Sequence, residues 1–110
     1  IGQGILAEPL VGRLDSKRIA VIQKRLLESV ASQRAHIVIL DVTGITMMDD
    51  HVAHALLQTA QAVRLLGART VMSGISANTA QTLAGLGVQF DEIQTVSDMG
   101  QALEYAHANL

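Results

Sequence analysis

Residues 37–40 read Ile37-Val38-Ile39-Leu40, an apolar run in which three residues are β-branched and no polar residue alternates with them. Runs of this kind are typical of strands that are covered on both faces in a parallel sheet. Parallel strands need crossover connections, and these are usually helices. The run therefore predicts the central strand of an α/β sheet.

The segments on either side of this strand alternate between strand and helix patterns. Further strands are predicted over residues 5–11 and 70–72 and within residues 88–95. The spacing of apolar residues predicts four helices: one after Asp15, one over residues 50–66, one over residues 76–86 that stops at Gly87, and one after Asp98. Such an order, joined by right-handed crossovers, gives a mostly parallel sheet layered with helices.

Length and composition indicate one globular domain over residues 1–110. The chain is 49% hydrophobic and 16% charged, which is enough apolar surface for one core. It has no cysteine, which excludes disulfides, thiolate nucleophiles and cysteine-ligated zinc. The sequence shows no secretory leader and no apolar run that could span a bilayer, so we expect a cytoplasmic protein without a membrane partner. Because the sequence starts at Ile1, we also expect that an N-terminal part is missing.

Charge is small overall but unevenly distributed. The formal net charge is −2, yet residues 1–34 carry six basic and three acidic side chains, while the remainder carries two basic and seven acidic ones. This asymmetry is typical of a domain that meets charged partners or copies of itself. One Tyr and one Phe leave little aromatic surface for stacking on bases, so we expect no nucleic-acid partner.

Residues 41–53 follow the central strand and are the most informative stretch for function. In open α/β sheets, ligands and partners bind outside the carboxyl ends of the strands. Asp49 and Asp50 stand where the loop becomes a helix, and a carboxylate there can accept backbone N–H groups and oppose the helix dipole. One helix start needs only one such cap. The same N–H groups favour phosphate, so a hydroxyl at this place would be a suitable phosphorylation site.

Two histidines and a glutamine extend this polar cluster along the predicted helix. His51, His54 and Gln58 share one helical face, which should be turned to solvent or to a partner. The aspartates and histidines do not converge as metal ligands at helical spacing, so we expect neither a metal ion nor a cofactor. The sequence contains no glycine-rich phosphate loop, no serine elbow and no set of acid, base and nucleophile. We therefore expect a protein that is not an enzyme.

Residues 41–53 resemble the signature of STAS domains, the fold of anti-sigma-factor antagonists. Further stretches are similar to the C-terminal STAS domain of stressosome co-antagonists of the RsbR type, and the resemblance covers nearly the whole chain. These stretches are Pro9-Leu10-Val11-Gly12-Arg13-Leu14-Asp15, Ala62-Val63-Arg64-Leu65-Leu66-Gly67-Ala68, Ala80-Gln81-Thr82-Leu83 and Leu86-Gly87-Val88.

The resemblance implies a fold, an assembly and a mechanism. The fold would be a mixed, mostly parallel sheet with helices mainly on one side. The domain would form homodimers or larger oligomers and join other STAS proteins in a sensor and scaffold assembly. That assembly holds a serine/threonine kinase, releases it when STAS hydroxyls are phosphorylated after stress, and so regulates a sigma factor. The N-terminal sensor half of such proteins is absent from this chain.

One residue departs from the family pattern. The family has Ser or Thr directly after the signature aspartate as the phosphoacceptor, and here Asp49 is followed by Asp50. Asp50 either imitates the phosphorylated state with a smaller charge or serves only the helix start. Thr82 is a candidate for the second phosphothreonine that some co-antagonists have.

The resemblance also suggests where partners bind and leaves a second function open. The candidate residues of the signature and partner surface are Asp41, Thr43, Asp49, His51, His54 and Gln58. The alternative function is binding of a small anionic ligand, a nucleotide or a lipid, at the helix start.

Overall fold

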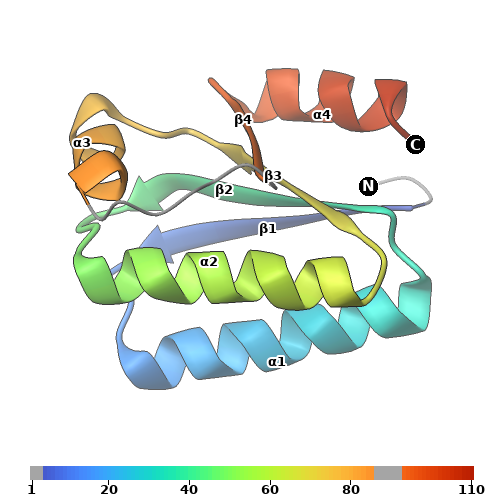
Figure 1. Cartoon of the computed structure of the whole chain (residues 1–110), viewed down its shortest axis with the longest axis horizontal. Helices are drawn as coiled ribbons and strands as arrows, with labels where there is room; N and C mark the ends of the chain where they lie inside the picture. Colours follow the sequence, from blue (N-terminus) through green and yellow to red (C-terminus); the bar gives the residue numbers. More distant parts are fainter. Residues whose placement is uncertain (1–3, 86–92) are drawn as a thin grey trace.

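The computed structural model describes residues 4–85 and 93–110. Within these residues strands alternate with helices in the order β1 (Ile5–Gly12), α1 (Ser16–Gln33), β2 (Ile37–Ile45), α2 (Asp50–Leu65), β3 (Arg69–Ser73), α3 (Ala77–Gly85), β4 (Ile93–Val96) and α4 (Met99–Ala108) (Figure 1). The predicted alternation is confirmed. The expected helix end at Leu86 and Gly87 and the expected start of the last strand at Val88 lie outside the described residues.

The sheet has the strand order β1-β2-β3-β4, and every pairing among the described strands is parallel. Because the order advances in one direction, right-handed crossovers place the connecting helices on one face. Figure 1 shows α1 and α2 side by side on that face, and α3 contacts α2. The last helix, α4, follows the last strand and covers the opposite face. The predicted mostly parallel sheet with helices mainly on one side is confirmed.

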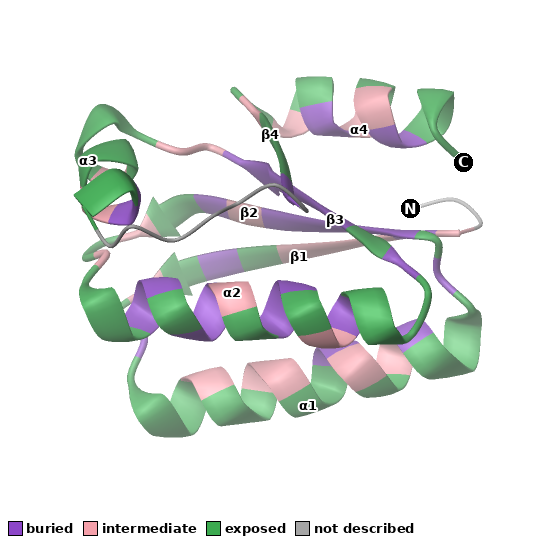
Figure 2. Cartoon of the chain, in the orientation of Figure 1, coloured by how far each residue is buried: buried purple, intermediate pink, exposed green. Residues whose placement is uncertain are grey.

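The central strand β2 contributes to two cores because its side chains alternate between the faces of the sheet. Val38 and Leu40 join the larger cluster, which includes buried side chains of α1 and α2. Ile37 and Ile39 join the smaller cluster, which includes buried alanines of α4. These four side chains are at most 1% exposed, and Figure 2 shows the buried positions along the sheet. The prediction of a strand covered on both faces is confirmed.

Side chains cap the starts of the helices. Asp15 accepts a hydrogen bond from the third backbone N–H of α1, at 2.8 Å, and Asp98 does the same for α4, also at 2.8 Å. At α3 the hydroxyl of Ser76 accepts the N–H of Thr79 at 3.1 Å. Each bond satisfies a backbone donor that the helix itself leaves unpaired.

β2 differs most from its predicted length. β2 continues to Ile45, whereas the apolar run ends at Leu40. The polar residues that follow Leu40 remain in the strand because an irregularity in its pairing with β1 accommodates them. This irregularity positions the candidate site.

Candidate functional site

The last part of β2 contains a bulge. Asp41 pairs with Pro9 of β1, but the next registered pair joins Gly44 to Val11, so β2 has one more residue than β1 between the two pairs. A bulge bends the strand and re-aims its side chains, and bulges are frequent beside functional sites. Here it precedes the loop that leads into α2.

Asp41 holds this bulge in place. One of its carboxylate oxygens accepts a hydrogen bond from the Thr43 backbone N–H at 3.0 Å and another from the Thr43 hydroxyl at 2.6 Å. Asp41 is half-buried and Thr43 is exposed. Both residues were predicted to belong to a partner surface, and among the described residues their side chains are hydrogen-bonded within this pair.

The turn after β3 approaches the bulge very closely. Gly74 has a φ of +80°, and a Cβ built on it would collide with the Thr43 hydroxyl and lie 2.9 Å from the Thr43 backbone nitrogen. Only glycine suits such a conformation and such an approach. The sequence does not indicate this contact with β2.

Asp49 and Asp50 have different roles at the start of α2. Asp49 is the N-cap, and its carboxylate accepts the Val52 backbone N–H at 2.8 Å. Asp50 is the first helical residue, and its exposed carboxylate has no hydrogen bond to another described residue. It is also the acidic residue in the first turn of α2, where the positive end of the helix dipole lies. The cap is therefore supplied by Asp49, and Asp50 adds an unpaired negative charge beside it.

The predicted polar stripe lies on the outside of α2. His51, His54 and Gln58 are all exposed. The His51 Nε2 atom lies 3.0 Å from the Ser16 hydroxyl, which joins the start of α2 to the start of α1. The His54 Nδ1–H donates to the Asp50 carbonyl oxygen at 2.8 Å. The structure thus brings the start of α2 and its stripe together with the start of α1.

The described residues of the site do not complete a Ser-His-Asp triad or a metal-binding group. The Ser16 and His51 pair has no carboxylate bonded to the imidazole among the described residues, so it lacks the third group of a Ser-His-Asp triad. Within the same residues no three His, Asp or Glu side chains are grouped for metal binding. Thr82 lies apart on α3, half-buried, and its hydroxyl donates to the Asn78 carbonyl oxygen at 3.2 Å.

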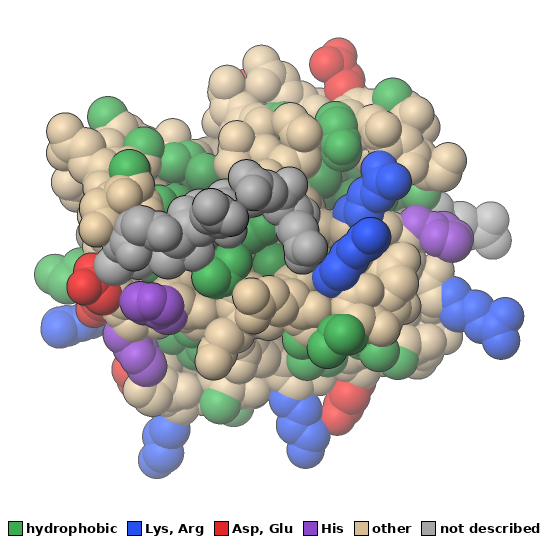
Figure 3. All heavy atoms as spheres, viewed as in Figure 1, with side chains coloured by type: hydrophobic (Ala, Val, Ile, Leu, Met, Phe, Trp, Pro, Cys, Tyr) green, Lys and Arg blue, Asp and Glu red, His purple; other side chains and the backbone are tan. Residues whose placement is uncertain are grey.

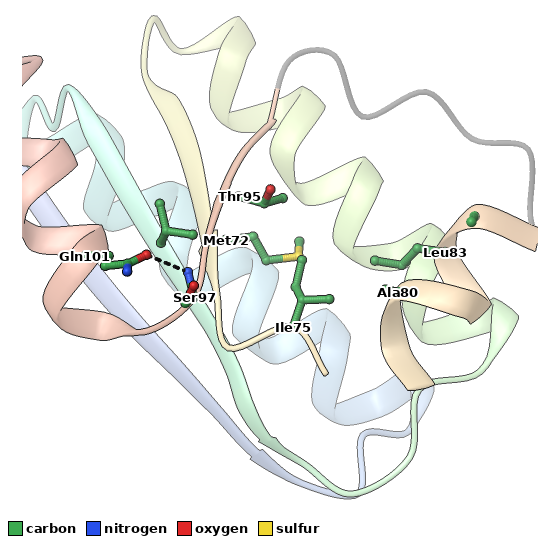
Figure 4. A pocket seen from close by; sticks show the side chains of 9 residues that line it. Met72, Ile75, Ala80, Leu83, Thr95, Ser97 and Gln101 are labelled. Carbon is green, nitrogen blue, oxygen red and sulfur yellow. Dashed lines mark hydrogen bonds between the residues drawn. The ribbon is translucent and has the colours of Figure 1, made fainter. Parts of the chain in front are cut away.

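A pocket of about 570 Å³ lies between α3 and α4 at the carboxyl ends of β3 and β4. In Figure 4 the side chains of Met72 and Ile75 lie between Leu83 on one side and Ser97 and Gln101 on the other. Gln101 accepts the Ser97 N–H at 3.0 Å. The rule that ligands bind outside the carboxyl ends of strands could have indicated this second place, but the sequence shows no motif for it.

The pocket does not favour the anionic ligand considered as an alternative. None of the described residues that line it is Lys or Arg, so an anion would lack a charged partner there. At the start of α2 the two carboxylates would repel an anion. In addition, the order of the described strands does not reverse, and such a reversal forms the ligand crevice of doubly wound sheets.

None of the helices in the described parts of the chain is long and apolar enough to cross a bilayer.

Comparisons with known proteins identify relatives of both the sequence and the fold. Residues 2–102 match the family model of the STAS domain. The RsbT co-antagonist protein RsbRA of Bacillus subtilis (strain 168) is 35% identical over 104 residues, which are 94% of this chain and 38% of that protein. The chain therefore spans little more than a third of the length of this relative.

Two solved structures share the fold. A variant of RsbS from Moorella thermoacetica has a TM-score of 0.85 at 19% identity, and the match covers 97% of this chain and 91% of that one. A chain from a structure of the stressosome, a signal integration and transduction hub, has a TM-score of 0.73 at 18% identity and covers 93% of this chain and 94% of that chain. At these identities the likeness shows the fold alone.

Proposed function

This chain belongs to the STAS domain family, and we propose that it is a non-catalytic interaction module of a cytoplasmic, stressosome-type assembly. In this role it self-associates, joins other STAS proteins and binds a serine/threonine kinase, whose release regulates a sigma factor. The observation that carries the proposal is the exposed carboxylate of Asp50, directly after the capping Asp49. We equate this position with the phosphoacceptor position of the family.

The helix dipole at the start of α2 supports the proposal that Asp50 permanently imitates a phosphorylated residue. A phosphate at this position would be stabilised by the helix dipole and by free N–H groups of the first turn. Asp50 places a negative charge there without a kinase, although one carboxylate carries less charge than a phosphate. We therefore propose that wild-type protein holds the kinase weakly.

The surroundings of Asp50 support a rigid contact surface. The hydrogen bonds between Asp41 and Thr43, together with the close approach of Gly74, fix the end of β2 from which the loop to α2 departs. The exposed stripe on α2 continues from the Asp50 position along the outside of the helix. We assign the kinase contact to Asp50 and this stripe.

Restoring the hydroxyl tests the proposal. Asp50→Thr should become a substrate of the cognate serine/threonine kinase, whereas the wild-type protein should receive no phosphate at residue 50. Mass spectrometry after incubation with the kinase would locate the modification, and the same spectra would report on Thr82, the proposed second site.

The chain supplies its own control for this experiment. Ser16 is the first residue of α1 and follows a capping aspartate, as residue 50 does in α2, and its hydroxyl lies 3.0 Å from the His51 Nε2 atom. Phosphate on residue 50 of Asp50→Thr but not on Ser16 would show that the kinase recognises the surface of α2. If Asp50→Thr stays unmodified while a Thr-bearing relative is phosphorylated, residue 50 is not the acceptor position and the proposal is wrong.

A further inference from the structure

The pocket between α3 and α4 is not used by the proposed kinase contact. Its volume of about 570 Å³ lies within the range of roughly 300–1,000 Å³ that is typical of small-molecule sites. It lies outside the carboxyl ends of β3 and β4, where α/β sheets bind their ligands. Figure 3 shows the surface dipping between α3, at the upper left, and the region of β4 and α4. Size and place therefore suit a ligand.

The inner part of this pocket is apolar. Met72 and Leu83 are buried beneath it, and the half-buried Ile75 lies between them and the opening (Figure 4). On the α3 side the wall includes Ala80 and Ala84, whose short side chains leave the space open. Methionine is unbranched and adapts its shape to what it contacts. The inner part is therefore suited to a hydrocarbon group.

The rim of the pocket is polar on the side of β4 and α4. Thr95, Ser97 and Gln101 line it and are exposed. The Gln101 Oε1 atom accepts the Ser97 backbone N–H at 3.0 Å, which holds the amide at the rim. The Gln101 amide N–H groups and the two hydroxyls make no hydrogen bond to another described residue. An amide donor and hydroxyls that donate or accept are thus available to a ligand.

The charges around the pocket disfavour an ionised ligand. None of the described residues that line it is charged, and the sequence contains no Lys or Arg after Arg69. In Figure 3 the blue side chains on this face lie below the pocket or to its right. The α4 start beside it has the carboxylate of Asp98, which accepts the Gln101 backbone N–H at 2.8 Å and would repel an anion. An ion of either sign would lose its hydration against the apolar wall without gaining a charged partner there.

We propose that this pocket binds an uncharged amphiphile, a small molecule with a hydrocarbon part and a hydroxyl or amide head group. The hydrocarbon part packs against Ile75 and Leu83, and the head group bonds to the Gln101 amide and the hydroxyls of the rim. The site is separate from the start of α2 and from the exposed stripe of that helix. The proposal therefore goes beyond the proposed function and does not depend on it.

A series of probes with the same hydrocarbon chain tests the head group. Octanol, octanoate and octylammonium would be titrated into isotope-labelled wild-type protein and followed by the NMR signals of its backbone amides. Octanol should shift the signals of Ile75, Leu83, Ser97 and Gln101. Its dissociation constant should be lower than those of the two ions by about tenfold or more, because only the ions lose hydration of a charge.

Filling the pocket tests the place. Ala80→Phe puts an aromatic ring into the space beside α3 and should weaken octanol binding by about tenfold or more, because the ring occupies the room of the hydrocarbon part. The matched control is Ala20→Phe, which makes the same change at an exposed alanine of α1, a helix that does not line the pocket. It should bind octanol as wild type does. Melting curves would confirm that both variants are folded.

A charge placed on the rim locates the head group. Gln101→Lys should bind octanoate more tightly than wild type does, and Gln101→Glu should do the same for octylammonium, because each variant supplies the opposite charge. The wild-type titrations decide the proposal by themselves. Signals that shift elsewhere, an ion that binds as tightly as octanol, or no shift up to the solubility limit of octanol would each overturn it. The kinase takes no part in these measurements, so such a result would leave the proposed function untouched.

Discussion

The starts of α1 and α2 have the same cap and differ in the residue that follows it. In each helix an aspartate, Asp15 or Asp49, accepts the backbone N–H three residues further on at 2.8 Å. The first helical residue is Ser16 in α1 and Asp50 in α2. The capping aspartates are explained by helix formation. The second carboxylate, that of Asp50, is not required for a helix to begin, because α1 begins without one.

The two starts also differ in how the preceding chain is held. The end of β2 before α2 is a bulge that is bonded through Asp41 and contacted by the turn at Gly74. The chain before α1 is held by a bond from the Arg18 side chain to the Arg13 carbonyl oxygen and by one from the Thr46 backbone N–H to the Gly12 carbonyl oxygen. The end of β2 is therefore held by side-chain contacts within β2 and by the turn after β3, whereas the end of β1 is held by hydrogen bonds from α1 and from the loop after β2.

The largest effect is expected from breaking the support of the α2 start. Gly74→Ala should lower the free energy of unfolding by about 2–4 kcal/mol, because alanine has both a left-handed backbone penalty and a collision with Thr43. Denaturation in urea would measure this loss.

Gly67→Ala is the matched control for this change. Gly67 has a φ of +89° but nothing within 4 Å of a Cβ built on it, so its loss should be the backbone penalty alone, about 1 kcal/mol. Equal losses at the two glycines would show that the contact with Thr43 does not constrain the bulge.

A smaller effect is expected from removing the aspartate that caps each of the two helices. Asp15→Ala and Asp49→Ala should each lower the free energy of unfolding by about 1 kcal/mol, because each leaves one backbone donor unpaired. Parallel thermal melts would compare them, with Asp98→Ala at the start of α4 as a third example. A much larger loss for Asp49→Ala alone would mean that this residue does more than cap the helix.

Local signals in the sequence were sufficient for most of the fold. The central strand follows from an uninterrupted apolar run, and the capping aspartates follow from their places before helical patterns. Each of these signals depends on residues within one turn or one strand. The proposed departure at Asp50 rests on a signal of the same kind, a change of residue type within a local signature.

The contacts that position the site could not be predicted, because they join residues far apart in the chain. The bulge depends on the register between β1 and β2, and the close approach of Gly74 to Thr43 depends on the pairing of β2 with β3. The contact between Ser16 and His51 spans 35 residues. In the sequence Gly74 is typical of a turn. Its neighbours in the chain do not show that a distant side chain, Thr43, also requires glycine there.

The smallest effect on stability, and the most direct for function, is expected at Asp50. Asp50→Asn keeps the size of the side chain and removes its charge, so the loss through the helix dipole should be about 0.3–1 kcal/mol. The reciprocal change Ser16→Asp places a second acid at the start of α1 and should raise stability by a similar amount.

Kinase binding separates these two changes. If the negative charge on α2 imitates the released state, Asp50→Asn should bind the kinase more tightly than wild type, while Ser16→Asp should bind it as wild type does. Calorimetric titration of the three proteins, with melting curves in parallel, measures both quantities. Unchanged affinity together with a small loss of stability would make Asp50 an ordinary N-terminal acid. The two helix starts would then differ in electrostatics alone, and the proposal that Asp50 imitates a phosphate would be wrong.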